Sequence, residues 1–508
     1  MTAISRTRKS VWNSSAAMGM YFINLVLEFY SRVIFLKYLG TEILGLNTTA
    51  VNLLQFLNLA EMGVWTAIAT SLYKPLHENN YDEINRIVTL NGHLYRRIGG
   101  LIILAAAVLM GFFPFIFKKM ELPLWYAYAS FSVLLFSSLI GYFFNYKQFL
   151  LSANQQNYKI IFSYKLVVAC KVVAQILAME LFPYPYFWWL GLEVGFACIA
   201  SFSLHLTVKK TFPALEKCQE GFKTLRKKYP EIIKKIKQLF VQKISGFVLF
   251  QTSPIIIYGL STLTLVTLYG NYMILINGII SLLSAMFNGM LAGIGNLVHT
   301  SEKGHILKVF DQLFAIRFYV IGVLCFGMWH GGQLFISWWL GAEYLLEPLT
   351  LGLLVAQFFF YVNRYVVYDF LSAYGYFGDV WASIAEVVIN IGLSVWLGIL
   401  WGLNGVIAGV LISIVIIAFG WKPFYLFKYK LKTGFGNFWA KMLNLSVTMA
   451  AAWIATGYIA PFFPTSAAVN LGALIINVLP GVAIFTIIYG LLLWLTSAPF
   501  RAVIHRFV

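Results

Sequence analysis

Charged side chains inside long apolar stretches are the residues of this chain that could do chemistry. The cations Arg32, Lys171 and Arg364 lie well within such stretches, and Lys147 lies near the end of another. A charge at the centre of a bilayer costs roughly 2.5–3.5 kcal/mol, so these side chains must face water or counter-charges. Arginine and lysine donors in such a place are suited to hold a phosphate or pyrophosphate group. The four cations are therefore the candidate binding residues.

Carboxylates are placed in the same way. They could line the same space, or one of them could titrate with a coupling ion, either Na⁺ or H⁺. The candidates are Glu28, Glu61, Glu193, Glu386 and Asp369, of which the last lies nearer the end of its apolar stretch.

Two interpretations of the cations are open. Either they line a hydrated cavity, or each is neutralised by a carboxylate and only ties helices together. For Lys171 and Arg364 the cavity is favoured, because no carboxylate lies one helical turn from Lys171 and Asp369 is on the wrong helical face for Arg364. Glu28 precedes Arg32 by four residues and can pair with it, so for Arg32 neither interpretation is favoured over the other.

No motif for catalysis or for a metal is present. The sequence has no phosphate-binding glycine loop, no cysteine or histidine cluster at metal-ligand spacing and no Gly-x-Ser-x-Gly. The four cysteines form no disulfide framework. We expect a protein that is not an enzyme and that uses no cofactor and no metal.

The elements that position these charges are membrane helices. Hydrophobic residues make up 60% of the 508 residues and charged residues only 11%, which is typical of a polytopic membrane protein. About fourteen stretches meet the length rule for a spanning helix. They are 15–38, 44–70, 96–116, 124–150, 159–181, 185–208, 238–259, 265–295, 316–338, 348–373, 381–400, 404–427, 438–460 and 468–496.

The charge of the loops predicts the orientation. Basic residues gather before the first stretch and in alternate loops, most densely in 209–237, whereas loops such as 460–467 carry no charge. Lys118 and Lys119 are the main exception. By the positive-inside rule both termini are cytoplasmic, and the same rule accounts for the net charge of +18 without nucleic acid as a partner.

A weak internal repeat predicts how the helices are grouped. Leu151-Ser152-Ala153 returns as Leu371-Ser372-Ala373, and the pattern that follows Glu61 returns near 291–306 at a similar offset. We therefore expect two parallel six-helix lobes, 1–208 and 238–430, around a central cavity, with two additional helices in 431–508. Between the lobes, 209–237 is predicted to be a basic cytoplasmic linker whose residues 231–240 form an amphipathic helix on the membrane surface.

Two short stretches in the first lobe resemble a known family. The sequence Tyr-Leu-Gly-Thr-Glu-Ile-Leu-Gly-Leu at 38–46 leads to Glu-Met-Gly at 61–63 and Ser-Leu-Tyr-Lys-Pro-Leu at 71–76. They are similar to elements of the polysaccharide flippases of the multidrug/oligosaccharidyl-lipid/polysaccharide exporter superfamily, with Met62 in place of the usual leucine. The fourteen-helix layout resembles this family too.

The resemblance implies that the protein moves a glycan linked to a polyprenyl pyrophosphate across the bacterial cytoplasmic membrane, without identifying the sugar. We expect alternating access by a monomer, with the headgroup in a cationic cavity and the polyprenyl tail in membrane lipid. An ion-coupled small-molecule antiporter of the same superfamily is the alternative, although central cations argue against an organic-cation substrate. A membrane glycan polymerase or ligase fits poorly, because the outward loops are short.

Overall fold

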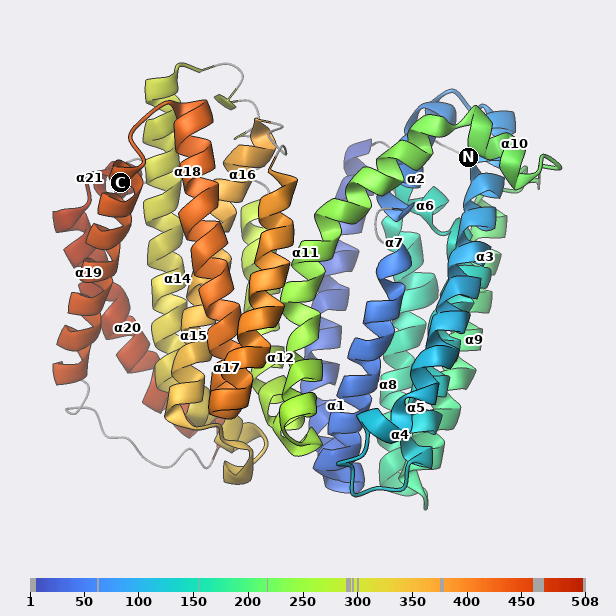
Figure 1. Ribbon diagram of the computed structural model, residues 1–508, viewed down its shortest axis with the longest axis horizontal. Coiled ribbons are helices and arrows are strands. Elements are labelled where there is room, and N and C mark those ends of the chain that lie inside the picture. Colours follow the sequence, from blue (N-terminus) through green and yellow to red (C-terminus); the bar gives the residue numbers. More distant parts are fainter. Residues whose placement is uncertain are drawn as a thin grey trace. The chain divides into compact units, whose positions relative to one another are not determined.

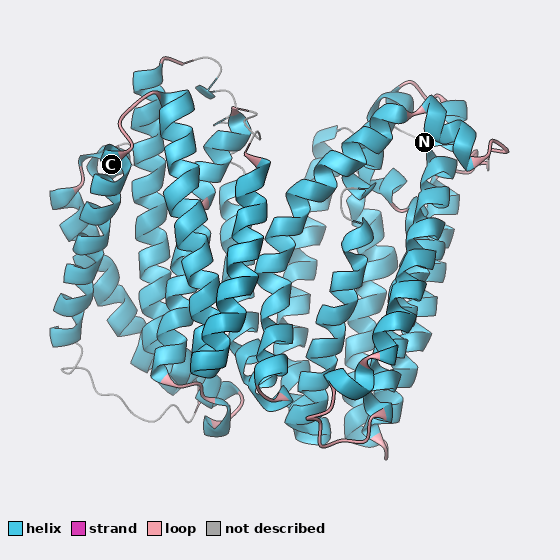
Figure 2. Cartoon of the chain, in the orientation of Figure 1, coloured by secondary structure: helices cyan, strands magenta, loops and turns pink. Residues whose placement is uncertain are grey.

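The computed structural model describes residues 6–61, 64–154, 156–216, 218–288, 294, 297–298, 301–374, 379–459 and 470–505. Helix accounts for 89% of it, and the described residues contain no strand (Figure 2). Eleven of the helices in this part are long and apolar enough to cross a membrane. Two of these spans, Met18–Leu57 and Trp381–Leu431, each join two predicted segments. The predicted class, an all-α polytopic membrane protein, is confirmed, and about fourteen helices is consistent with it.

The chain divides into two compact units, Met1–Thr267 and Leu268–Val508 (Figure 1). The division falls later than residue 238, where the sequence repeat begins its second lobe, so the seventh predicted segment belongs to unit 1. Because the units are defined by spatial contacts and the lobes by sequence similarity, the lobe boundaries stay a prediction.

Unit 1 is a bundle of long helices with short helical turns between them. Its α-helices are α1 (Arg6–Leu57), α2 (Val64–His77), α3 (Tyr81–Gly111), α4 (Phe113–Ile116), α5 (Trp125–Phe143), α6 (Phe149–Ala153), α7 (Asn157–Ile160), α8 (Leu166–Leu181), α9 (Pro185–Thr211), α10 (Phe222–Lys228) and α11 (Pro230–Leu260). Three turns, η1 (Asn58–Glu61), η2 (Asn145–Lys147) and η3 (Ile161–Lys165), interrupt them, and α12 (Leu263–Asn288) continues into unit 2.

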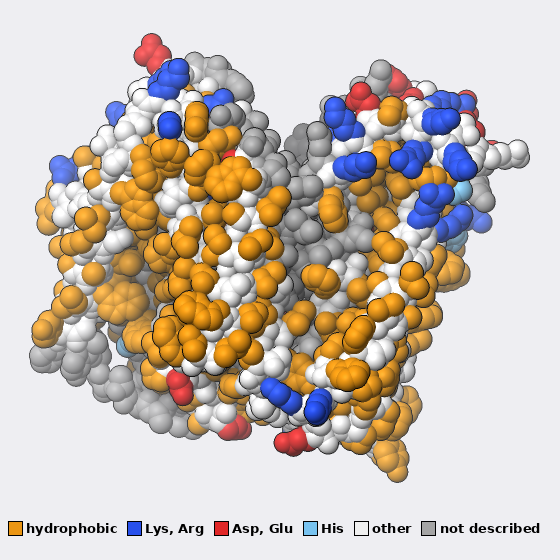
Figure 3. All heavy atoms as spheres, viewed as in Figure 1, with side chains coloured by type: hydrophobic (Ala, Val, Ile, Leu, Met, Phe, Trp, Pro, Cys, Tyr) orange, Lys and Arg blue, Asp and Glu red, His pale blue; other side chains and the backbone are white. Residues whose placement is uncertain are grey.

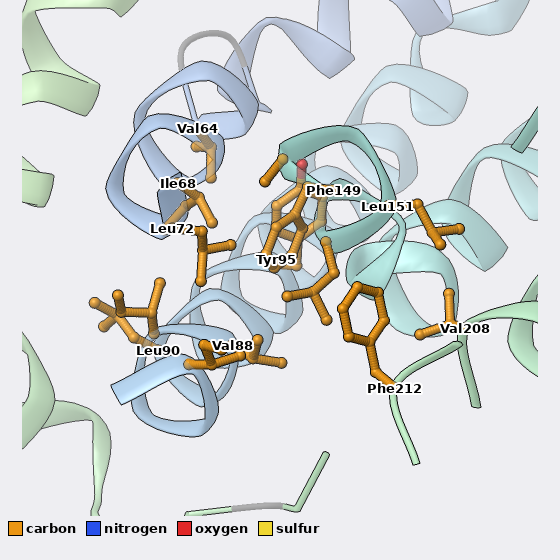
Figure 4. Close-up of a cluster of buried hydrophobic side chains, with 14 of the residues drawn as sticks. Val64, Ile68, Leu72, Val88, Leu90, Tyr95, Phe149, Leu151, Val208 and Phe212 are labelled. Carbon is orange, nitrogen blue, oxygen red and sulfur yellow. The ribbon is translucent and has the colours of Figure 1, made fainter. Parts of the chain in front are cut away.

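Apolar side chains of α2, α3, α6 and α9 form a core at one end of unit 1. Ile68, Leu90, Leu151 and Val208 are buried in this cluster, with Tyr95, Phe149 and Phe212 between the first two and the last two (Figure 4). Tyr95 of α3 belongs to the same cluster, and its hydroxyl is the polar atom that Figure 4 shows among these carbons. The core therefore fixes the relative positions of α2 and α3, and with them Tyr95, which contacts the candidate residue Glu61.

The predicted second segment, 44–70, is not one continuous helix. Helix α1 passes through a kink at Gly40, whose φ of 80° favours glycine, and ends at Leu57. The turn η1 follows, in which Asn58 donates a hydrogen bond to Ser138 of α5 at 3.3 Å. Glu61 therefore stands at a break between two helices, where polar side chains bond to neighbouring helices, and not inside a continuous span.

The predicted helix at 231–240 is part of a longer one. These residues form the first part of α11, which continues into the seventh segment without a break. Pro230 stands at the start of α11, where its missing N–H costs nothing. Whether this part lies on the membrane surface stays a prediction.

Unit 2 consists of α14 (Lys303–Trp339), η4 (Ala342–Tyr344), α15 (Pro348–Asn363), α16 (Tyr365–Ala373), α17 (Val380–Ile414), η5 (Val415–Trp421), α18 (Lys422–Leu426), η6 (Phe427–Leu431), α19 (Gly436–Ile459), α20 (Leu471–Thr496) and α21 (Ala498–Ile504). The turns η5 and η6 are π-helical. Of the repeated pattern near 291–306, residues 291–293, 295–296 and 299–300 lie outside the described residues.

Two helices join at Gly402 within α17. This glycine has a φ of 58°, and the helical segments on either side of it fold back on each other. A Cβ atom at Gly405 would overlap the backbone carbonyl of Leu397, and one at Gly409 would overlap the backbone of Ser394. Glycine at these two positions therefore permits the close contact between the two helical segments.

Candidate functional site

Lys171 has a carboxylate partner on the neighbouring helix. Its Nζ lies 2.7 Å from Oε1 of Glu193, between α8 and α9. Gln175, one turn further along α8, donates to Glu193 Oε2 at 3.2 Å and to the carbonyl oxygen of Trp189 at 3.1 Å. Glu193 is only 8% exposed. The expectation that Lys171 lacks a counter-charge is wrong, because spacing along one helix cannot show a partner on the next.

Arg364 is paired in the same way in unit 2. It stands at the break between α15 and α16, and its Nη1 lies 3.3 Å from Oε1 of Glu386 on α17. Both side chains are buried, at 6% and 3% exposure. The guanidinium carbon also lies 4.1 Å from the ring centroid of Tyr361, and the rings of Tyr365 and Tyr368 are within 5.6 Å and 5.4 Å. The expectation of an uncompensated cation is wrong here too.

Asp369 pairs with an arginine that the sequence analysis missed. Its Oδ2 lies 2.8 Å from Nη2 of Arg317 on α14, a residue only 1% exposed. Arg317 is the second residue of the apolar stretch 316–338. A charged residue at the start of an apolar stretch was the feature of the sequence that could have indicated it. Asp369 does not pair with Arg364, as predicted from its position on a different face of the helix.

A further buried pair joins the start of α17 to α18. Lys422 Nζ lies 2.8 Å from Oδ2 of Asp379, which also accepts a hydrogen bond from Trp421 Nε1 at 3.0 Å. Lys422 and Asp379 are 6% and 4% exposed. Lys422 lies within the predicted segment 404–427, and the helical run continues past it to Leu431.

Glu61 is held by tyrosine hydroxyls. Tyr95 of α3 donates to Glu61 Oε1 at 2.9 Å, and Tyr142 of α5 is hydrogen-bonded to the same carboxylate. Both tyrosines are buried, and their ring centroids are 5.8 Å apart. Both partners are neutral hydroxyls, so neither of them brings a counter-charge to this carboxylate.

Two of the predicted cations have other surroundings. On α1, Arg32 donates through Nη2 to the carbonyl oxygen of Thr267 at 3.2 Å, one turn after Glu28. Lys147 lies in η2, half-buried, and has no salt-bridge partner in the part of the chain that the structure describes. Burial lowers the pKa of the Lys147 ammonium.

Four buried or partly buried pairs, one in unit 1 and three in unit 2, compensate the charges of their cations. Such pairs stabilise a bundle only when both partners are present, because a buried charge without its partner is costly. Among the described residues no group of His, Cys, Asp and Glu side chains could hold a metal ion.

Comparison with known proteins identifies the fold. The sequence matches no protein-family model and no curated protein. Among solved structures, the lipid II flippase MurJ in an inward closed conformation has a TM-score of 0.66 at 16% sequence identity, over 95% of this chain and 99% of that chain. An inward-facing multidrug resistance MATE family transporter of the MOP superfamily has a TM-score of 0.54 at 14% identity, over 83% of this chain and 98% of that chain. The chain is therefore a multi-pass membrane protein with the fold of these transporters.

Proposed function

We propose that the protein is a flippase that moves a polyprenyl-pyrophosphate-linked oligosaccharide across the bacterial cytoplasmic membrane by alternating access. The observation that carries this proposal is the similarity to a lipid II flippase over 95% of this chain. The similarity to the MATE transporter covers 83% of this chain. Both alignments include almost the whole of the other protein, at 99% for the flippase and 98% for the MATE transporter. More of this chain's helices thus have a counterpart in the flippase than in the multidrug transporter.

The antiporter remains the second candidate, and the buried pairs favour it more than the sequence alone did. Central cations without partners would argue against an organic-cation substrate. Because Lys171 and Arg364 are paired with Glu193 and Glu386, that objection loses its force. A glycan polymerase or ligase has no support from the fold, since the similar structures are transporters.

Within the proposed flippase, the pyrophosphate is bound by Arg32 and the paired cations position helices. Arg32 lies in an apolar part of α1, and a guanidinium group can donate two parallel hydrogen bonds to a phosphate. Glu61 is the proposed coupling carboxylate, because its observed partners are neutral hydroxyls. We propose further that the chain acts as a monomer, with both termini in the cytoplasm.

The test compares two transport readouts in one host that lacks the chromosomal copy. Lipid-linked glycan on the outer face and efflux of a cationic dye are measured with wild-type protein, Arg32→Gln and the control Lys37→Gln. Lys37 lies on the same helix and is exposed, so its replacement should leave both readouts unchanged. The flippase proposal expects Arg32→Gln to abolish outer-face glycan, while dye efflux is absent throughout.

Dye efflux that depends on Arg32, with normal glycan, would favour the antiporter. Normal glycan from folded Arg32→Gln would remove Arg32 from the headgroup site. Arg32→Lys keeps the charge and should retain partial transport, since a phosphate accepts either cation in a different geometry.

A further inference from the structure

The segment between α9 and α11 is docked on α3 and is not a free linker. Arg86 of α3 contacts Glu220 at 2.9 Å, and Lys228 of α10 lies 3.8 Å from the same carboxylate. The backbone N–H of Cys218 donates to Thr89 Oγ1 at 3.1 Å. Basic side chains gather at this end of unit 1 (Figure 3). The segment therefore has a defined position against the helix.

A ring contact holds the next part of the segment to the same helix. The guanidinium carbon of Arg97 lies 3.6 Å from the ring centroid of Phe222, and the ring of His93 lies 6.2 Å from it. A cation over an aromatic face contributes about 0.5–1 kcal/mol at an exposed site. The contacts from Arg86 to Arg97 thus extend along several turns of α3.

This docking encloses a small pocket between α3, η2 and the segment. Its volume is about 80 Å³, and its lining includes Thr89, His93, Arg96, Tyr146, Lys147 and Glu216. A water molecule occupies about 30 Å³ in the liquid, so the pocket has room for a group the size of one phosphate but not for a sugar.

The far wall of the pocket is held in place by close packing. Gly92 faces the Tyr146 ring so closely that a Cβ atom there would come within 3.0 Å of it. Asn91 Nδ2 donates to the carbonyl oxygen of Tyr146 at 3.1 Å. The neighbouring Lys147 is therefore presented from a fixed backbone, which reduces the entropy lost on binding a ligand.

The lining favours an anion. Two cations, Arg96 and Lys147, line the pocket with one carboxylate, that of the exposed residue Glu216. Lys147 has no salt-bridge partner among the described residues, in contrast to the paired Lys171. A half-buried ammonium without a counter-charge loses part of its hydration, and an anion beside it offsets that cost.

We propose that this pocket binds one phosphate group, through the ammonium of Lys147 and the guanidinium of Arg96, with the hydroxyl of Thr89 as an additional donor. Thr89 Oγ1 already accepts from Cys218, so its own hydrogen is available. The site is separate from Arg32 and does not rest on the flippase proposal. The phosphate belongs either to a lipid headgroup or to a free anion.

The test uses full-length protein in nanodiscs of phosphatidylcholine, with radiolabelled inorganic phosphate as the probe. Saturable binding is expected, and Lys147→Gln and Arg96→Gln should each weaken it by at least about tenfold, the loss of a hydrogen bond to a charged group. Lys147→Arg should keep most of the affinity. The matched control is Lys210→Gln, an exposed lysine at the end of α9 outside the pocket, which should bind as wild type does.

A second arm identifies the source of the phosphate. Phosphatidylglycerol in the nanodisc should compete with the probe if the pocket takes a lipid headgroup, and should leave binding unchanged if it takes a free anion; either result supports the site. Absence of saturable binding, or equal losses in Lys210→Gln and Lys147→Gln, would overturn the proposal. Arg96 is exposed, so its variant keeps the test valid if Lys147→Gln does not fold.

Discussion

Breaking the Arg364–Glu386 pair should destabilise the protein strongly, whereas removing both charges should not. At 3.3 Å the attraction between the charges is roughly 5 kcal/mol with an effective dielectric constant of 20. Desolvation offsets much of it while both partners are present. When one partner is removed, the other remains buried without compensation, at a cost of about 3–5 kcal/mol.

The two single variants should differ. Arg364→Met strands Glu386, which is 3% exposed, and also removes the cation from the Tyr361 ring. Glu386→Gln leaves Arg364 among three tyrosine rings, each of which attracts a cation. We therefore expect Arg364→Met to be the more damaging change. The double variant Arg364→Met, Glu386→Gln buries no charge and should be close to wild type in stability.

The assay is a double-mutant cycle on detergent-solubilised full-length protein, with unfolding in sodium dodecyl sulfate followed by tryptophan fluorescence. A coupling energy of about 2–3 kcal/mol is expected for groups in direct contact. Surface glycan is measured in the same variants. If Arg364→Met unfolded at the wild-type detergent concentration yet lost transport, Arg364 would be a substrate ligand and the structural interpretation of the pair would be refuted.

Three further outcomes are expected. Lys441→Ala removes a 2.6 Å ion pair to α14 that is partly exposed, so it should cost about 1 kcal/mol or less and leave transport intact; a loss of transport in stably inserted protein would show that α19 contributes to the site. Gly405→Ala places a methyl group against backbone and should lower the yield of folded protein, whereas Gly392→Ala, with open space around it, should not; equal yields would contradict the close helix contact. A cysteine at Thr262 should react with an impermeant thiol reagent from outside and one at Lys227 should not; the reverse pattern would invert the proposed topology.

The class of the fold and its helical segments could be predicted because both follow from local sequence. Apolar length places the spans, and Gly40 and Gly402 lie where two predicted segments meet. The break before Glu61 could not be predicted from hydropathy, since the residues around it are apolar enough to continue a helix. It depends on bonds from Asn58 and Glu61 to other helices.

The pairing of the charges was missed for a different reason. Helical spacing reports neighbours on one helix, whereas Glu193 and Glu386 are supplied by the next helix. Lys171 and Glu193 stand at similar distances on either side of the turn between α8 and α9, which places them at similar depth in an antiparallel hairpin. Comparing depths across each turn would have predicted this pair. The partner of Lys422, Asp379, lies just before α17, more than forty residues away, so spacing along one helix could not show this pair either.

The pairing of the buried charges has a consequence for how the protein responds to voltage. Moving one elementary charge through a membrane potential changes the free energy by about 2.3 kcal/mol per 100 mV. A cation and a carboxylate that move together, as Lys171 with Glu193 or Arg317 with Asp369 must when each belongs to one compact unit, displace no net charge. These pairs contribute no gating charge, so any voltage dependence of transport must come from the substrate, the coupling ion or the charges that are not paired.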